Sequence, residues 1–298
     1  MVKAKFQGTG TALVTPFTSG GDVDEVALLR LVDFQLKNGV DMLFPCGTTG
    51  ESPTLEDSEW ERIVSLILER VNGAIPVIVG AGSNSTAHAV RMTRKAASLG
   101  ADGVLSVGPY YNRPQQDGYF QHYKAIAEAA DIPVVVYNVP PRTAGNIHPE
   151  TTLRLAELPG IVAVKEASGS IDQVGEIVRN RPEGFRVLSG DDPLTVAEIA
   201  MGADGVVSVT SNQVPGLFTK MVDAALCGEI ARAQEVHYRL LPLMRANFVE
   251  PSPVPVKSLL AMMGLIEEEY RLPLVKPLEG TREELRRVAE GLDLPLKR

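Results

Sequence analysis

The sequence predicts an α/β protein, a (β/α)8 TIM barrel with a C-terminal helical extension. Short apolar runs alternate with amphipathic helical segments eight times between residues 9 and 226. The runs are apolar on both faces, as strands of a parallel sheet covered by helices are. The main alternative is a doubly wound open sheet that binds a dinucleotide, but no glycine-rich fingerprint follows the first strand.

The strands are expected where β-branched and other apolar residues cluster between turn residues. The first run ends at Pro16-Phe17, and the later runs are bounded by Gly, Pro, Asn or Asp. The eight expected strands cover residues 9–15, 42–45, 76–79, 103–107, 133–137, 161–165, 185–188 and 205–209.

Each strand is followed by a segment with helical spacing. After the first strand, Asp22 and Asp24 offer caps, and Asn38-Gly39 is a helix stop. The second helix has an apolar face that includes Trp60, and residues 54–57 resemble a capping box. The remaining helices are expected near residues 86–99, 116–130, 149–157, 171–180, 193–201 and 217–226.

The alternation stops near residue 228. Three further helices are expected at residues 230–247, 255–263 and 282–291. We therefore expect residues 1–227 to form the barrel. Residues 228–298 would form C-terminal helices that pack on it or face an oligomer partner.

Composition excludes several classes of protein. The 298 residues are 44% hydrophobic and 22% charged, as in ordinary globular proteins. A net charge of −8 without a Lys/Arg cluster argues against binding to nucleic acid or an anionic membrane. The N-terminus lacks a signal peptide, and no apolar run is long enough to span a bilayer. Cys46 and Cys227 lie far apart and fit a reducing cytoplasm.

Lys165 is the most informative residue, because it closes the apolar run of residues 161–164. An ammonium in an apolar setting is costly, so its pKa should fall from about 10.4 toward neutrality. A neutral amine there is a nucleophile for carbonyl groups. The alternative is a lysine whose stem packs while its head reaches water or Glu166.

In a barrel, the carboxyl ends of the strands share the face that carries the active site. The opposite ends carry little beyond glycine and proline. This asymmetry favours a functional role for Lys165. The residues expected on the catalytic face are Thr48, Thr49, Tyr110, Tyr111, Tyr137, Arg142, Lys165, Gly190, Asp191, Asp192, Ser208 and Ser211.

Tyr137 and Lys165 end adjacent strands, so a phenol could shuttle the protons that imine formation needs. The alternative is a tyrosine that caps the core with its hydroxyl in water. Thr48 and Thr49 can hydrogen-bond a carboxylate or the phenol, although threonine is also common in loops and caps. Arg142 could grip a substrate carboxylate, but alone it would be read as a surface arginine.

Other chemistries have weaker support. Asp191 and Asp192 would repel a phosphate, while Gly190 beside them would let a substrate approach the backbone. No histidine ends a strand, so no Ser/His/Asp arrangement is expected. The four histidines show no metal-ligand spacing, and we expect no metal: His88, His122, His148 and His237. Imine chemistry remains the best-supported class.

Five motifs resemble those of the pyruvate-dependent class I aldolases related to N-acetylneuraminate lyase. The likeness runs from Gly8 to the C-terminal helices, and the set is far more specific than any single motif. It is strongest with the synthase branch, which joins pyruvate to L-aspartate 4-semialdehyde in lysine (diaminopimelate) biosynthesis. The motifs are GTTGE at 47–51, GPYYNRP at 108–114, YNVPPRT at 137–143, VKEA at 164–167 and LSGDD at 188–192.

The resemblance implies a role for each site residue. Lys165 would form a Schiff base with pyruvate, and Tyr137 would donate and accept protons. Thr48 and Tyr111 would complete a proton relay, with Tyr111 reaching into the neighbouring subunit's site. The substrates would be held by Thr49, the Val207 backbone, Gly190 and Arg142, the last on the semialdehyde's carboxylate. The family implies a homotetramer, a dimer of two tight dimers, and no cofactor.

Two alternatives to the synthase remain. The first is another pyruvate-dependent aldolase with a different aldehyde. Such branches generally lack the Pro-x-Arg-Thr pattern that residues 140–143 keep, although Pro141 stands where small residues are commoner. The second is an idle barrel with a binding or regulatory role, but the intact set of Lys165, Tyr137, Thr48 and Tyr111 argues against it.

Regulation is the point where the chain departs from the family. Members inhibited by lysine bind it at the dimer interface, and Asn84, Ser52 and Tyr110 match that pattern. His88 stands where sensitive bacterial members have an acidic residue, and their usual histidines are replaced by Asp57 and Trp60. We expect weak or absent inhibition by lysine.

Overall fold

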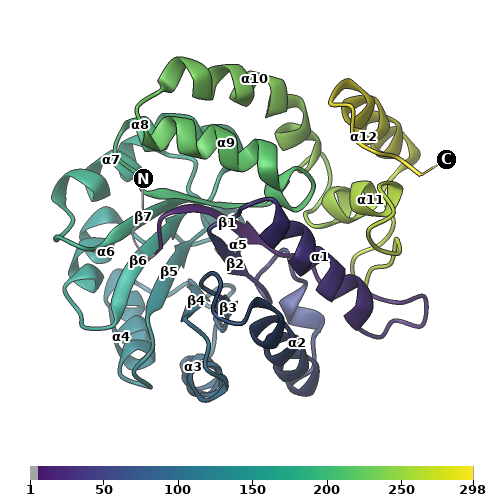
Figure 1. Ribbon diagram of the computed structural model, residues 1–298. Coiled ribbons are helices and arrows are strands. Elements are labelled where there is room, and N and C mark those ends of the chain that lie inside the picture. Colours follow the sequence, from purple (N-terminus) through teal and green to yellow (C-terminus); the bar gives the residue numbers. More distant parts are fainter. Residues whose placement is uncertain (1–5, 298) are drawn as a thin grey trace.

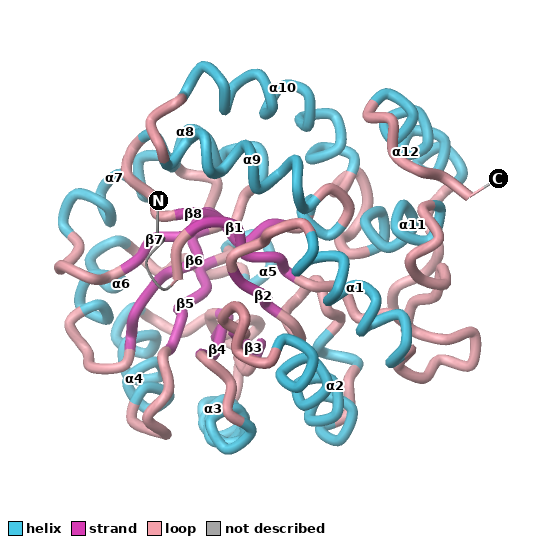
Figure 2. Tube along the Cα trace, in the orientation of Figure 1, coloured by secondary structure: helices cyan, strands magenta, loops and turns pink. Residues whose placement is uncertain are grey.

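The protein is described here by a computed structural model, which covers residues 6–297. In this part of the chain eight parallel strands form one sheet, in the order β2-β1-β8-β7-β6-β5-β4-β3 (Figure 2). The strands are β1 Gly8–Ala12, β2 Met42–Phe44, β3 Ile78–Gly80, β4 Gly103–Val107, β5 Val134–Asn138, β6 Ile161–Glu166, β7 Arg186–Ser189 and β8 Gly205–Ser208.

The sheet closes between β2 and β3. A parallel bridge joins Leu43 to Val77, and the Leu43 amide donates to the Pro76 carbonyl at 3.0 Å. Farther along, the Gly80 amide donates to the Pro45 carbonyl at 2.9 Å. The predicted (β/α)8 barrel is therefore confirmed.

Helices follow the strands and surround the barrel (Figure 1). The short helix α5 Pro140–Thr143 follows β5 directly and was not expected from the sequence. The longer surrounding helices are α1 Glu25–Lys37, α2 Asp57–Val71, α3 Thr86–Leu99, α4 Gln116–Ala127, α6 Pro149–Ala156, α7 Ile171–Asn180, α8 Thr195–Ala200 and α9 Pro215–Leu226.

Two apolar cores result from the alternation of side chains along each strand. The larger core lies between the outer face of the sheet and the helices. The smaller core includes inward-pointing residues of all eight strands: Ala12, Met42, Phe44, Ile78, Leu105, Val135, Tyr137, Ala163, Leu188 and Val207. Tyr137 thus belongs to the barrel interior, at its catalytic end.

The chain ends in α10 Ile230–Ala246, α11 Val254–Met262 and α12 Glu279–Gly291. Figure 1 shows α10 lying over α9, and α11 and α12 lying beyond α1. Arg30 of α1 donates to the Leu265 carbonyl at 3.1 Å, which ties the barrel to the segment after α11. No helix within residues 6–297 combines the length and apolarity needed to cross a membrane.

Several element bounds differ from the sequence prediction by a few residues, and two differences have a clear physical reason. The first strand is shorter than expected: the Leu13 amide still donates to the Phe44 carbonyl at 3.1 Å, but the Val14 amide donates to the Asn212 side chain at 3.1 Å. The capping box at residues 54–57 is wrong. The box starts at Glu56, whose amide donates to Glu59 at 3.0 Å. Glu56 and Glu59 form the capping box, whereas Thr54 lies in the 3₁₀ turn Ser52–Thr54.

Candidate active site

Lys165 and Tyr137 lie side by side because β5 and β6 are neighbours in register. Tyr137 pairs with Lys165, and the next residues, Asn138 and Glu166, also pair. The Lys165 amine lies over the Tyr137 ring, 4.1 Å from its centroid. Parallel strands in this register point both side chains into the barrel at its carboxyl end. The predicted pair is therefore brought together.

The Lys165 amine is 6% exposed, and burial lowers its pKa to about 7. The carboxylate of Asp192 partly opposes this shift, and the positive charge of Arg142 adds to it. Much of the amine is then neutral at physiological pH. The alternative in which its head pairs with Glu166 is wrong. The Glu166 carboxylate accepts bonds from Asn138, Ser168 and Gln173 in the outer layer.

Burial shifts the pKa of the Tyr137 phenol upward, in the direction opposite to the shift of the Lys165 pKa. Burial raises its pKa to about 12, against the smaller opposing effects of the Arg142 charge and of a side-chain hydrogen bond from Thr48. A phenol with this pKa is protonated at neutral pH, so it can donate a proton to a developing alkoxide or hydroxyl leaving group. Thr48 is therefore placed to orient that proton.

The loop after β2 brings Thr48 and Thr49 to the site. Its turn is closed by the Gly50 and Ser52 amides, which donate to the Gly47 carbonyl at 3.1 and 3.3 Å. At the end of β1, the Thr15 hydroxyl donates to the Gly50 carbonyl at 2.7 Å. Thr49 is 6% exposed, which leaves its hydroxyl in a largely dry setting.

Gly190 lies beside Lys165, and Val207 lies on β8, which is separated from β6 by β7. A Cβ on Gly190 would lie 2.6 Å from the Ala167 Cβ and 3.2 Å from the Lys165 Cε. Only glycine therefore leaves the lysine side chain this space. Val207 is buried in β8, and the neighbouring Asp192 carboxylate accepts bonds from the Val209 and Thr210 amides.

Tyr111 and Arg142 lie apart from the buried pair. The Tyr111 side chain is 90% exposed and its φ is +70°, an unusual value for a non-glycine residue. Within the described chain Tyr111 thus projects from the surface and is not packed against Tyr137. Arg142 is exposed on α5, and its Nη2 donates to the Ser252 carbonyl at 3.3 Å.

A cavity of about 430 Å³ opens beside the pair, and Thr48, Tyr137 and Arg142 are on its wall. Lys165 is not on this wall, and its amine faces the Tyr137 ring. The same cavity extends to five residues that the resemblance assigned to regulation: Ser52, Asp57, Trp60, His88 and Tyr110. Substrate-sized space thus exists beside three of the predicted residues, Thr48, Tyr137 and Arg142.

Sequence reasoning missed a buried polar pair immediately behind the site. Asn138 Nδ2 donates to both Glu166 oxygens, at 3.1 and 3.0 Å, and both residues are 1% exposed. Each follows a predicted catalytic residue directly. A polar residue at the outward position of a strand end was the available signal.

No group of three or more His, Cys, Asp or Glu side chains within residues 6–297 is arranged to hold a metal ion. His122 is a buried histidine on α4, and burial lowers its pKa to about 4. Its Nδ1 lies 2.9 Å from the Thr86 hydroxyl, a structural contact between helices.

Comparison with known proteins shows the family of this chain. The model of the dihydrodipicolinate synthetase family matches residues 5–291. The chain belongs to this family. The 4-hydroxy-tetrahydrodipicolinate synthase of Koribacter versatilis is 51% identical over 286 residues, which are 96% of this chain and 95% of the relative.

Solved structures of the family agree. Dihydrodipicolinate synthase from Aquifex aeolicus superposes with a TM-score of 0.96 at 44% identity, covering 98% of this chain and all of that one. The chloride-inhibited enzyme from Acinetobacter baumannii, solved with pyruvate, has a TM-score of 0.96 at 38% identity. It covers 97% of this chain and all of its own.

Proposed function

We propose that the protein condenses pyruvate with L-aspartate 4-semialdehyde through an imine on Lys165. The product is 4-hydroxy-tetrahydrodipicolinate, the compound in the name of the Koribacter relative. One observation carries the proposal. A lysine amine with a pKa near 7 lies against a tyrosine ring at the carboxyl ends of adjacent barrel strands. This is the arrangement that nucleophilic catalysis on a keto acid requires.

The reaction begins when the neutral Lys165 amine attacks the keto carbon of pyruvate. Loss of water leaves an imine, and loss of a methyl proton gives an enamine. The enamine carbon attacks the aldehyde carbon of the second substrate, whose oxygen takes a proton and becomes a hydroxyl. The amino group of that substrate then attacks the imine carbon, which closes the ring and releases Lys165.

Tyr137 serves as the proton donor and acceptor in these steps. Its raised pKa keeps the phenol protonated until an oxygen with developing charge needs a proton. Thr48 links the phenol to Tyr111, which we assign to the relay of a neighbouring subunit. The 90% exposure of Tyr111 supports this assignment, because a partner can bury it. We propose the family's homotetramer of two tight dimers as the assembly.

Substrate binding is assigned to the groups around the pair. Thr49, Gly190 and the Val207 backbone hold pyruvate beside the Lys165 amine. Arg142 binds the carboxylate of the semialdehyde, since its guanidinium lies on the cavity wall. We place the reaction in a reducing cytoplasm, a proposal supported by the free thiols of the chain.

The experiment is pyruvate consumption by the purified protein with and without aspartate 4-semialdehyde, beside the Lys165→Ala variant. We expect consumption that needs both the aldehyde and Lys165. If none occurs, borohydride trapping with pyruvate separates the alternatives. An adduct on Lys165 would mean the same chemistry with another aldehyde, and no adduct would favour an idle barrel.

A further inference from the structure

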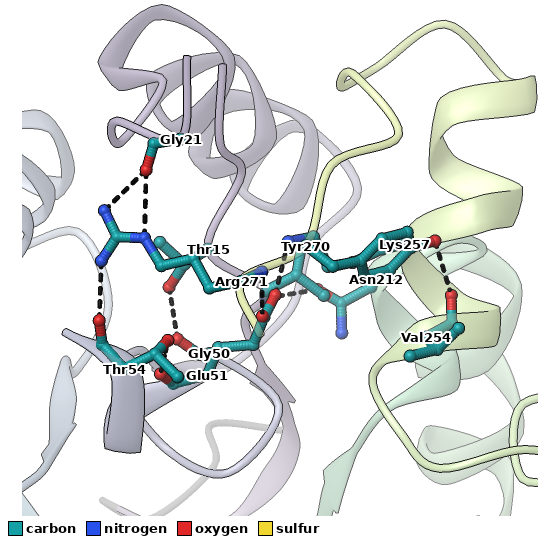
Figure 3. Close-up of polar contacts among 11 residues, drawn as sticks. Thr15, Gly21, Gly50, Glu51, Thr54, Asn212, Val254, Lys257, Tyr270 and Arg271 are labelled. Atoms are coloured by element: carbon teal, nitrogen blue, oxygen red, sulfur yellow. Dashed lines mark hydrogen bonds and ion pairs between the residues drawn. The ribbon is translucent and has the colours of Figure 1, made fainter. Parts of the chain in front are cut away.

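Glu51 and Lys257 form an ion pair that is almost completely buried, at the boundary between the barrel and the C-terminal helices. The Lys257 amine donates to Glu51 Oε1 at 2.5 Å, and the two side chains are 0% and 1% exposed. Figure 3 shows Glu51 on the loop after β2 and Lys257 on α11, 206 positions later in the chain. Charged side chains are rarely fully buried even in pairs, because removing them from water is costly, so this buried pair is an uncommon feature of the molecule.

A second basic residue, Arg271, also contacts Glu51. The Arg271 amide donates to Glu51 Oε2 at 3.3 Å, and its guanidinium donates to the Thr54 carbonyl at 2.7 Å. The ring of Phe17 contacts both cations. Lys257 Nζ is 4.3 Å and Arg271 Cζ is 4.4 Å from its centroid. Both ends of the segment 51–54 are thus held from the C-terminal part of the chain.

Glu51 connects this arrangement to the active site. Its amide donates to the Thr48 carbonyl at 3.1 Å, and its φ is +53°, a left-handed conformation that needs outside support in a non-glycine residue. Thr48 and Tyr137 lie on the wall of the same cavity, and a side-chain hydrogen bond with Thr48 opposes the rise in the Tyr137 pKa. Direct contacts therefore run from Lys257 through Glu51 to the Thr48 loop, which borders the same cavity as the proposed proton donor.

We propose that Lys257 and Glu51 are a positioning pair, through which the C-terminal helices hold Thr48 against the Tyr137 phenol. The inference rests on the proposed function, because it assigns a purpose to Thr48 in that reaction. Neither residue touches the substrate. Their part is to keep the Thr48 hydroxyl within hydrogen-bond reach, where a displacement of about 1 Å would cost on the order of 100-fold in rate.

A double-mutant cycle on kcat tests the proposal. Lys257→Met removes the charge and keeps the length of the side chain, and Thr48→Val removes the hydroxyl. We expect Lys257→Met to lower kcat about 10- to 100-fold with the KM for pyruvate changed less than about threefold. In the Thr48→Val background the same change should lower kcat less than about twofold, because residues that act as a unit are not additive.

Glu268→Gln is the matched control, since Glu268 forms another ion pair of the C-terminal region, with Arg282, and also accepts from Ser258. It should leave kcat within about twofold of the wild type. If Lys257→Met folds poorly, Glu51→Gln/Lys257→Met removes both charges together and enters the same cycle. Equal losses of kcat in both Thr48 backgrounds, or no loss at all, would refute the positioning role.

The activity of the wild-type protein shows whether a negative result counts against this proposal or against the proposed function. If it fails to condense the two substrates, the proposed function fails. The cycle is then run on the rate of imine formation with pyruvate, measured by borohydride trapping and mass spectrometry. If the wild type is active and the Lys257 variants match it in either assay, only the positioning role fails.

Discussion

Lys165 and Tyr137 show how one environment prepares two groups for opposite roles. Burial disfavours the charged form of each, so the amine loses its proton more readily and the phenol keeps its proton more firmly. A neutral nucleophile and a neutral proton donor then coexist at the same pH. Pairs of titratable groups moved in opposite directions are typical of acid–base sites.

The pH dependence of imine formation follows from the Lys165 pKa of about 7. Only the neutral amine attacks pyruvate, so the rate should be level above pH 7 and fall roughly tenfold per unit below it. Borohydride trapping in the presence of pyruvate, followed by mass spectrometry across this range, measures the midpoint. Lys165→Ala supplies the background. A midpoint close to that of an exposed lysine, about 10.4, would contradict the prediction.

Arg142→Ala should impair the second substrate and spare the first. We expect kcat/KM for aspartate 4-semialdehyde to fall about 10- to 100-fold, because a charged hydrogen-bond partner of the carboxylate is lost. The assay belongs near pH 9, since the Arg142 charge also lowers the Lys165 pKa and its removal would slow imine formation at neutral pH.

Arg154→Ala is the control for that variant, because Arg154 is on the outer helix α6 and pairs with Asp117. It should behave like the wild type. An Arg142→Ala protein that uses carboxylate and non-carboxylate aldehydes in unchanged proportion would show that Arg142 does not recognise the acceptor.

At the scale of elements, the site depends on the register between β5 and β6. Inward positions carry Tyr137 and Lys165, and the outward positions that follow carry Asn138 and Glu166. Burial raises the pKa of the Glu166 carboxyl, while its bonds to Ser168, Asn138 and Gln173 oppose the shift. One layer therefore holds the strands together, and the other carries the two residues to which we assign the chemistry.

Asn138→Leu tests this division. It removes the donor to both Glu166 oxygens and leaves a buried carboxylate with fewer partners, so the free energy of unfolding should fall by about 2 kcal/mol. Urea denaturation measures the loss. Asn180→Ala, at the exposed end of α7, removes only side-chain bonds to Glu176 and should change stability by less than about 0.5 kcal/mol. Equal effects of the two variants would contradict a stabilising role for the Asn138–Glu166 pair.

At the scale of the whole molecule, one cavity joins the active site to the predicted regulatory residues. Trp60 and His88 line it together with Tyr137. His88 Nδ1 lies 2.7 Å from the Arg91 guanidinium, which adds positive charge where an ammonium ligand would have to bind. Asp57 lies 4.0 Å from the same guanidinium, so its negative charge is partly engaged.

Inhibition by lysine should therefore be weak, with the rate unchanged in millimolar lysine. His88→Glu should create sensitivity, because a carboxylate there offers the ligand's amine a partner worth about tenfold in affinity. Initial rates at rising lysine concentrations measure this. His148→Glu, at an exposed position before α6, is the control and should stay insensitive. Strong inhibition of the wild type would refute the prediction.

Much of this architecture could be predicted from the sequence, because its signals are local. Apolar runs and helical spacing depend on residues within a few positions of one another, and α3, α7 and β4 have the bounds expected from them. Lys165 and Tyr137 stood out because each occupies the polar end of an apolar run. The same local reasoning misplaced the cap of α2 by two residues, where acidic side chains formed the box instead of Thr54.

The barrel and the position of Lys165 at the carboxyl end of a buried strand could be predicted from sequence, since strand ends and burial follow from the hydrophobic pattern. The polar residues behind the catalytic face became apparent from the folded arrangement alone. Glu51 meets Lys257 across 206 positions, and the Asn138–Glu166 contact depends on the register of two strands. Such contacts depend on how whole elements dock, and no local pattern of residues records that geometry.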